Sequence, residues 1–239
     1  MPSPVDNLTD ALLGPILAAD PAGPRVTYYD DATGERIELS ASTLANWAAK
    51  TANMVRDEFA LEPGGKVAVL LPAHWQSVAV LLGVWWAGGE VVLSPDADAD
   101  AELAFVTADR LDDVADVPEV AALSLDAFGK GLSDLPLGVA DYATSIRVHG
   151  DQFRSAGAGS ALEGRSVADT IDAARASAKN VELVSTDRVL SSRTWDTADE
   201  LIDGLLAVLA AGASLVQVAH PDAEATARRV GTEKVTKQF

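Results

Sequence analysis

The feature that most constrains the fold is a strand–helix–strand pattern whose strands are apolar on both faces. Val67 to Leu71 forms the first such strand, His74 to Ala87 the helix, and Val91 to Leu93 the second strand. Gly88 and Gly89 follow the helix, and glycine readily adopts the left-handed conformation that ends a helix. A strand that is apolar throughout is typical of a parallel sheet covered on both faces. The pattern therefore predicts an α/β protein with layers of helices on largely parallel β-sheets.

The same order of elements recurs later in the chain. A strand is expected at Arg188 to Ser191, a helix from about Thr197 to Ala211, and another strand at Ser214 to Ala219. Gly212 supplies the residue that ends the helix. The two units are alike in plan and not residue by residue. We therefore expect two crossover units of one α/β fold rather than a solenoid of repeats.

The sequence before the first unit predicts a helix, a β-hairpin and a second helix. Leucine and isoleucine at helical spacing indicate a first helix that ends near Asp20. Arg25 to Asp30 and Glu35 to Leu39 are β-rich runs separated by a short turn, so they are expected to pair as a hairpin. Ser40 or Ser42 is expected to cap the next helix, because a serine hydroxyl accepts a hydrogen bond from a free first-turn amide.

The region between the two units is less regular. Strands are expected at Ala104 to Thr107 and at Val120 to Leu125. Asp126 to Ala161 is rich in Gly, Ser, Asp and Ala, which favours loop structure. We expect one short strand within it, near Ala143 to Val148. This irregular segment is the predicted internal boundary of the chain.

The charge of the chain limits its partners. It carries 36 acidic and 18 basic side chains, a formal net charge of −18. Such a charge repels nucleic acids and anionic membranes, which are not expected as partners. The one basic stretch, Arg228 to Lys237, is expected to be a solvated helix end rather than an anion-binding arm.

The composition also bears on chemistry and location. The sequence has no cysteine, which excludes disulfides, a thiolate nucleophile and zinc–thiolate sites. Its first residues, Met1 to Asp6, lack the basic start and apolar core of a secretory signal. The longest apolar runs are shorter than the ~20 residues of a membrane-spanning helix. The expected location is therefore the cytoplasm.

The sequence contains three histidines that could act as a general base or a metal ligand, and none lies in a motif typical of either role. His74 is expected at a helix start, His149 in a turn and His220 after a strand. A His-Glu-x-x-His helix and a Gly-x-Ser-x-Gly elbow are both absent from the sequence. We predict no catalytic residue.

An acidic run has part of the spacing of a calcium loop. Asp96, Asp98 and Asp100 occupy the first, third and fifth positions. Ala101 then stands where glycine is required, and Thr107 where a bidentate glutamate is required. The run is expected to be a solvated loop, and no metal site is predicted.

One glycine-bearing segment is a candidate phosphate loop. Its candidate nucleotide-binding residues are Gly157, Gly159, Ser160 and Gly164. A Lys-Ser or Lys-Thr pair does not follow, and the third glycine of a dinucleotide fingerprint is displaced. The segment is therefore expected to be a flexible linker rather than a phosphate loop.

Four short motifs are similar to those of a known family. They are Pro63 to Val67, Trp86 to Gly89, Thr186 to Ser191 and Leu209 to Val216. Together they resemble the AMP-dependent synthetase and ligase family, the adenylate-forming enzymes that include acyl-CoA synthetases. The resemblance implies the first part of that family's large N-terminal domain, as a single truncated domain over residues 1–239. Residues 1–130 and 131–239 are candidate subdomains.

The departures from the family fall on its chemistry. Counting back from the helix before residue 187 places Gly164 on the last glycine of the family's phosphate loop and Glu163 on its lysine. The family's aromatic-histidine patch would fall near Thr194 to Asp196, which contains no histidine. The sequence ends at Phe239, before the positions expected for the adenine and ribose motifs and the catalytic lysine. ATP or AMP is therefore implied by the resemblance alone, and its phosphate loop is degenerate.

These observations lead to two functional hypotheses. The first is a non-catalytic pseudoenzyme that binds a protein partner, a second copy of itself, or a small acyl or nucleotide ligand. The second is half of an AMP-forming acyl-CoA synthetase-like ligase, split between chains or completed by oligomerisation. Phosphoryl and acyl activation need several charge-stabilising groups acting together, which favours the first hypothesis.

Overall fold

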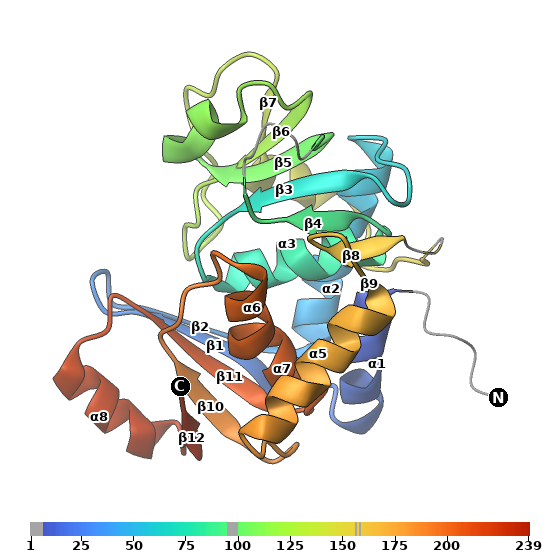
Figure 1. The fold of residues 1–239 in the computed structure, drawn as a ribbon. Helices are drawn as coiled ribbons and strands as arrows, with labels where there is room; N and C mark the ends of the chain where they lie inside the picture. The colour runs from blue at the N-terminus through green and yellow to red at the C-terminus, as the bar shows by residue number, and fades with distance from the viewer. Residues whose placement is uncertain (1–6, 95–99, 156, 158) are drawn as a thin grey trace.

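Two β-sheets with a layer of helices between them organise the computed structural model (Figure 1). The structure describes residues 7–94, 100–155, 157 and 159–239. The larger sheet has seven strands in the order β7-β6-β5-β3-β4-β8-β9, and the smaller has five in the order β12-β10-β11-β1-β2.

The larger sheet is parallel except at one edge. Its strands are β3 (Lys66–Leu70), β4 (Glu90–Val92), β5 (Leu103–Thr107), β6 (Glu119–Leu123), β7 (Val139–Asp141), β8 (Ser160–Leu162) and β9 (Arg165–Ser166). Only the β8–β9 hairpin pairs in the antiparallel sense among these described strands. The central strand β3 is buried on both faces, from Val67 to Leu70. The predicted parallel sheet is confirmed.

The smaller sheet combines strands from the N-terminal and C-terminal parts of the chain. It contains β1 (Pro24–Asp30), β2 (Glu35–Ser40), β10 (Arg188–Ser191), β11 (Ser214–Ala219) and β12 (Lys237–Gln238). β1 and β2 form the predicted antiparallel hairpin, while β1, β11, β10 and β12 pair in parallel. Both sheets thus take strands from either side of residue 130, and the division into subdomains stays a prediction.

Helices fill the space between the sheets (Figure 1). They are α1 (Leu8–Ala19), α2 (Ala41–Asp57), α3 (Trp75–Trp86), α5 (Val167–Asn180), α6 (Ala198–Leu201) and α7 (Ala207–Ala210). Helix α8 (Ala223–Thr232) lies instead on the outer face of the smaller sheet. Ser40, not Ser42, caps α2 by accepting a hydrogen bond from the amide of Thr43 at 3.1 Å. α2 and α3 approach so closely at Gly83 that a Cβ added there would lie only 2.4 Å from Cβ of Thr51. None of the helices in the described part of the chain is both long and apolar enough to cross a bilayer.

The prediction of a strand near Ala143 to Val148 is wrong. This segment forms the short helix α4 (Tyr142–Ser145) and the 3-10 turn η2 (Ile146–Val148). β-branched residues favoured a strand, but Tyr142 and Ile146 lie four residues apart and are both buried, which is helical spacing. The side chain of Asp141 also caps the turn by accepting a hydrogen bond from the amide of Thr144.

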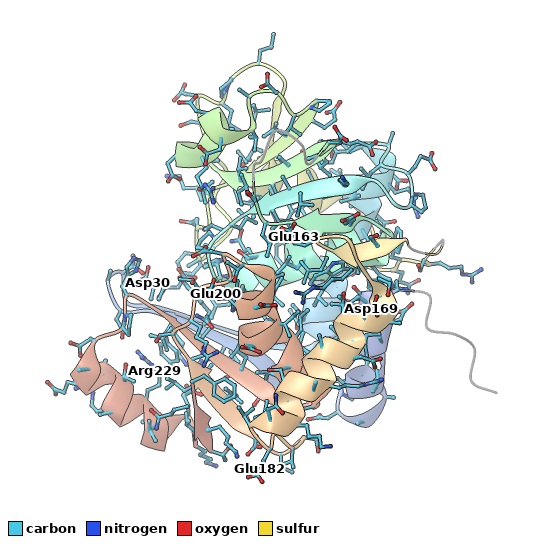
Figure 2. The ribbon with its side chains drawn as sticks, in the orientation of Figure 1. Asp30, Glu163, Asp169, Glu182, Glu200 and Arg229 are labelled. Atoms are coloured by element: carbon cyan, nitrogen blue, oxygen red, sulfur yellow. The ribbon has the colours of Figure 1, made fainter. Side chains whose placement is uncertain are left out.

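The basic stretch near the C-terminus is only partly solvated. Arg229 on α8 (Figure 2) is 7% exposed. It pairs with Asp31 at 2.5 Å. Glu233, at the end of α8, accepts hydrogen bonds from Tyr29, Arg36 and Arg188. Ion pairs therefore hold α8 against the outer face of the smaller sheet, beside a small apolar cluster that includes Val216 and Val218.

The β8–β9 hairpin turns at two residues with left-handed backbone, Glu163 (φ 47°) and Gly164 (φ 75°). The side chains of Glu163 and Glu90 attach this turn to β4 and the residue that follows it. Glu163 Oε1 accepts from the amide of Leu93 at 2.7 Å, and Glu90 Oε1 accepts from the amide of Gly164 at 2.7 Å. The hairpin is thus fixed to the neighbouring strand by side-chain hydrogen bonds.

Replacing Glu233 with Gln is expected to lower the free energy of unfolding by about 1–2 kcal/mol at neutral pH, because a charged acceptor is lost from a partly buried network. Burial raises the pKa of Glu233, but hydrogen bonds from Tyr29, Arg188 and Arg36 outweigh burial and lower it to about 2. The ionised carboxylate therefore stabilises the fold above its ordinary pKa of 4.5, and this contribution is lost as the pH falls from there through 2. Urea denaturation at several pH values measures it.

Glu224→Gln on the same helix is the matched control. Glu224 pairs with Arg228, and both side chains are exposed, at 86% and 63%. An exposed pair of this kind contributes roughly 0–1 kcal/mol. Equal effects of the two substitutions would contradict the assigned role of Glu233.

Gly164→Ala should destabilise the protein by roughly 1 kcal/mol, because a Cβ is disfavoured at positive φ. Gly14→Ala, in the helix α1, should instead stabilise it by roughly 0.5–1 kcal/mol. A Cβ at either position meets no heavy atom within 4 Å, so the backbone conformation alone decides the sign. Thermal or urea unfolding of both variants compares them directly; shifts of the same sign would refute the hairpin assignment.

Candidate functional site

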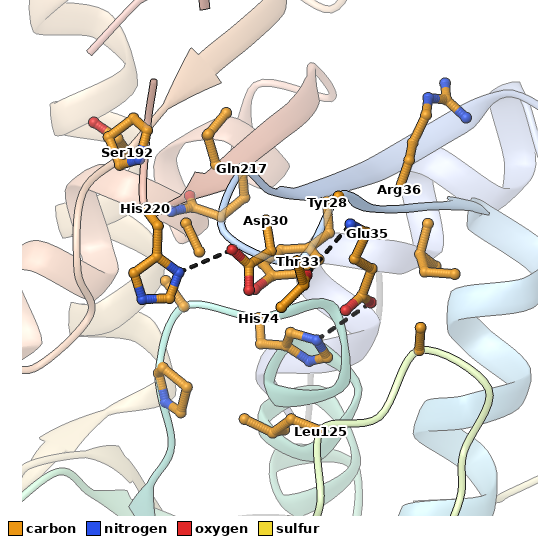
Figure 3. Close-up of a pocket in the computed structure, with 18 of the residues that line it drawn as sticks. Tyr28, Asp30, Thr33, Glu35, Arg36, His74, Leu125, Ser192, Gln217 and His220 are labelled. Atoms are coloured by element: carbon orange, nitrogen blue, oxygen red, sulfur yellow. Dashed lines mark hydrogen bonds and ion pairs between the residues drawn. The ribbon is translucent and has the colours of Figure 1, made fainter. Parts of the chain in front are cut away.

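A cavity of about 1160 Å³ opens where strands of both sheets end (Figure 3). Its lining comes from the β1–β2 hairpin and from the segments that follow β3, β6, β10 and β11. In an open parallel sheet, ligands bind outside the carboxyl ends of the strands. The position and size of the cavity therefore make it the candidate site.

The rim of the cavity contains two strained backbone positions. Leu125, after β6, has φ of 56°, and His220, after β11, has φ of 47°. Neither residue is glycine, so this left-handed conformation is maintained at some energetic cost. His220 pairs with Asp30 through Nδ1 at 2.9 Å, which links the β11 end to the hairpin.

His74 lies against the cavity and is held by the start of α3. Its Nδ1 accepts the hydrogen bond from the amide of Gln76 at 3.1 Å, so the imidazole caps the helix. The residue is 2% exposed, and this burial lowers its pKa to about 3. Its Nε2 has no hydrogen-bond partner. The Tyr28 ring packs edge-to-face with the imidazole, with ring centroids 4.3 Å apart.

Gln217 is a second buried polar residue in the lining. It lies on β11 between apolar neighbours and is 2% exposed. Its Nε2 donates to the carbonyl of Arg193 at 3.0 Å, whereas its Oε1 has no hydrogen-bond partner. An unpartnered buried acceptor costs free energy unless something binds it.

Carboxylates dominate the charge of the lining. Glu35 is close to His74, with Oε1 3.7 Å from Nε2, and it accepts a hydrogen bond from the indole of Trp75 at 3.3 Å. Burial raises the pKa of Glu35, and the nearby charges of Asp30 and Asp126 raise it further. The site around His74 is therefore acidic and poorly solvated.

The two arginines of the lining form ion pairs with carboxylates that do not line the cavity. Arg36 pairs with Glu233 at 3.0 Å, and Figure 3 shows its side chain pointing away from His74. Arg193 lies 3.7 Å from Asp203 and stacks over the ring of Phe239. Neither guanidinium balances the carboxylates near His74.

A loop held by hydrogen bonds to Asp126 forms another side of the cavity. Asp126 Oδ1 accepts hydrogen bonds from the amides of Phe128 and Lys130, and its carbonyl accepts from Gln76 Nε2. Phe128 is 93% exposed at the rim. Phe128 thus presents a large aromatic side chain to solvent at the mouth of the cavity.

The glycine-segment residues do not line this cavity. Ser160 lies in β8 and Gly164 in the hairpin turn. Gly157 packs by its carbonyl against Gly88, where a Cβ would come within 2.3 Å of that oxygen. Gly159 lies close to Gly64, because a Cβ added to Gly159 would be 3.6 Å from Cα of Gly64. A nucleotide-binding role for this segment stays a prediction.

The histidines separate in the structure. His74 is the helix-start residue expected from the sequence, and it lines the cavity together with His220. His149 lies elsewhere and pairs with Glu58 at 3.0 Å. Asp96 and Asp98 lie outside the described residues. Within the residues that the structure does describe, no three His, Asp or Glu side chains are grouped to hold a metal ion.

Two cavity residues were missed by sequence reasoning. Gln217 is the one polar residue among Leu215, Val216 and Val218 of a buried strand. Glu35 opens the second strand of the hairpin. A polar residue within an apolar strand, near its carboxyl end, was the available signal for Gln217.

Solved structures of ligases share this fold. The chain superposes on an acyl-CoA synthetase from Brucella canis with a TM-score of 0.78 and 19% identity, over 97% of this chain and 46% of that one. It is also similar to a benzoate CoA ligase from Burkholderia xenovorans (TM-score 0.71, 18% identity, 94% and 48% covered). The third is an acetoacetyl-CoA synthetase from Streptomyces lividans (TM-score 0.76, 18% identity, 97% and 42% covered). The chain thus has the adenylate-forming fold, as the sequence predicted, and spans about half the length of these ligases.

A curated relative matches over almost its whole length. It is a TIGR03089 family protein of Mycobacterium tuberculosis, 57% identical over 239 residues, with 97% of each chain covered. No family model matches the chain. At this identity and coverage, the chain belongs to the TIGR03089 family.

Proposed function

We propose that this protein binds a small acyl or nucleotide ligand in the cavity between its two sheets and does not catalyse adenylation. The observation that carries the proposal is the cavity of about 1160 Å³ that opens where strands of both sheets end. A largely apolar pocket with a few convergent polar groups is the usual form of a small-molecule site.

The absence of catalysis is proposed from charge. Glu163 stands at the position where the family resemblance implies a lysine, and its carboxylate is hydrogen-bonded to the amide of Leu93. The cavity lining is rich in carboxylates, while Arg36 and Arg193 pair with Glu233 and Asp203. Transfer of a phosphoryl-type group requires cations placed on the developing negative charge. The residues that the structure describes around the cavity therefore do not fit the triphosphate of ATP.

The similar ligases suggest the class of ligand to test. Their names refer to acyl-CoA, benzoate and acetoacetyl-CoA chemistry. We carry over only the expectation that an acyl or aryl group, or a nucleoside, occupies the cavity. A protein partner or a homo-oligomer, expected from the sequence, remains a separate prediction that native mass measurement would address.

Ligand binding should depend on the loop at the cavity mouth. Ala127→Trp places a large ring beside Phe128 and is expected to weaken binding of any cavity ligand about tenfold or more by occupying its volume. Calorimetric titration with acyl-CoA esters, aryl acids and amides, adenosine and AMP measures the effect. Ala115→Trp, on an exposed position outside the cavity, is the control and should leave affinity unchanged. Equal affinities for both variants would place binding elsewhere.

ATP–pyrophosphate exchange tests the catalytic part of the proposal. The expected result is no exchange above background with any carboxylic acid of a broad panel. Exchange that disappears on replacing Gly164 or Ser160 would show that the hairpin segment works as a phosphate loop, and would overturn the proposal of a non-catalytic protein.

A further inference from the structure

We propose that a second cavity binds a small molecule with one negatively charged group on an apolar body, such as an aliphatic carboxylate. This cavity of about 390 Å³ opens between α1, α5 and α7, which pack against one another (Figure 1). Its size lies within the range of roughly 300–1,000 Å³ that is usual for small-molecule pockets. The inference does not depend on the proposed function, because the two cavities share no lining residue.

The second cavity lies where strands β1 and β11 begin. Arg25 is the second residue of β1, and Gly212 comes just before β11. The first cavity is lined instead by Asp30, at the other end of β1, and by Ala219, at the other end of β11. Because these strands pair in parallel, the two cavities lie at opposite ends of the same strands. A molecule in one cavity therefore does not occupy the other.

Arg25 is a buried arginine with no carboxylate at hydrogen-bond distance among the described residues. Its Nη1 donates to the carbonyls of Gly212 and Ala213 at 2.6 and 3.2 Å. Its Nε is enclosed by the fold and is not available to a ligand. The third nitrogen, Nη2, is 3.9 Å from Oδ2 of Asp20, which is too far for a hydrogen bond. Since the side chain is still 7% exposed and lines the cavity, Nη2 is the nitrogen that can meet an anion there.

A second arginine is equally buried in the described part of the chain, and it is neutralised much more closely. Arg229 pairs with Asp31 at 2.5 Å, and the side chain of Asp31 is only 9% exposed. Asp20, by contrast, is 60% exposed, so water screens its charge. Burial lowers the pKa of Arg25, and the charge of Asp20 offsets this only in part. An anion bound beside Arg25 would relieve the cost of its incompletely compensated burial.

The net charge of the lining favours a monoanion. Arg175 on α5 adds a second cation to the cavity, and it lies 4.0 Å from Asp172, which is 81% exposed and does not line the cavity. Arg25 and Arg175 together with Asp20 give the lining two positive groups and one negative group. One negative charge on a ligand balances this excess, whereas the two charges of a phosphate exceed it.

Apolar residues form most of the remaining wall. Ala11, Pro15 and Ala19 come from α1, while Ala210 and Ala211 come from the end of α7. None of these five residues is fully buried, so their apolar surface is open to the cavity. Covering such surface favours an apolar ligand body over a bare anion. The cavity thus combines one accessible buried cation with an apolar wall.

Octanoate, octanol and acetate test the inference on the full chain near neutral pH. Octanol lacks the charge of octanoate, and acetate lacks its apolar chain. In calorimetric titration, octanoate is expected to bind about tenfold tighter or more than octanol, because octanol cannot form the charged pair with Arg25. Acetate should show no measurable binding. In protein-observed NMR, octanoate should shift the signals of Ala11, Ala19 and Ala211.

Variants of two residues test the role of charge. Arg25→Met removes the guanidinium and should weaken octanoate binding about tenfold or more without changing octanol binding, whereas Arg25→Lys keeps the charge and should retain part of the affinity. Circular dichroism checks their folding, because Arg25 also bonds to Gly212 and Ala213. Asp20→Asn keeps an acceptor for the amide of Gly23 and removes the competing charge, so octanoate affinity should rise about two- to fivefold.

Arg175→Ala and Arg228→Ala form a matched pair. Both arginines are exposed, at 65% and 63%, and each is paired with a carboxylate on its own helix. Arg175→Ala should weaken octanoate binding about two- to fivefold, whereas Arg228→Ala, on α8, should leave it unchanged. Ala127→Trp, which fills the first cavity, should also leave it unchanged.

The outcomes separate this inference from the proposed function. Absence of octanoate binding, or octanol binding as tightly as octanoate, overturns the inference and leaves the proposed function intact. Octanoate binding that Ala127→Trp abolishes assigns the molecule to the first cavity and likewise overturns the inference. Octanoate affinity that is unchanged in Asp20→Asn and in every folded variant of Arg25 does the same.

Discussion

Burial of α3 between the two sheets is the constraint on which the rest of the structure depends. Every residue from Trp75 to Trp85 is buried, and each large apolar side chain removed from water stabilises the fold by roughly 1.5–3 kcal/mol. The close contact of Gly83 with Thr51 sets the distance between α3 and α2, and the indole of Trp85 donates to the carbonyl of Ala161 at 2.7 Å. Because His74 caps this helix, the packing that buries α3 also holds the imidazole against the cavity.

The shared fold and the local charge have different implications for function. A TM-score of 0.78 to an acyl-CoA synthetase establishes the framework, but function depends on the groups placed on that framework. Around the cavity those groups are the carboxylates of Asp30, Glu35 and Asp126 and two neutral polar side chains, His74 and Gln217. This arrangement places carboxylates, and no unpaired arginine, beside the cavity among the described residues. The basic side chains are used instead to attach α8 through Arg229 and to satisfy Glu233.

Most of the secondary structure was predictable because its causes are local. The apolar strand Val67 to Leu71, the cap at Ser40 and the β1–β2 hairpin each depend on neighbouring residues in the sequence. The segment after residue 126 was harder, because short elements such as α4 are determined by which side chains become buried against other parts of the chain. The glycine-rich composition near residue 160 indicated a candidate phosphate loop. In the structure Gly157 and Gly159 pack beside Gly88 and Gly64, Gly164 turns a hairpin, and none of the three lines the cavity.

By itself, the sequence determined the α/β class, the parallel strands and the adenylate-forming framework, because periodicity, glycine positions and short motifs are properties of neighbouring residues. Only the tertiary structure decided where the cavity lies. The cavity is assembled from residues as distant in sequence as Glu35, His74, Asp126 and Gln217, which meet because the β1–β2 turn, the start of α3 and the segments at the ends of β6 and β11 lie on the same side of the two sheets. Whether a polar atom in that space is left without a partner depends on this long-range packing, and no local pattern in the chain records it.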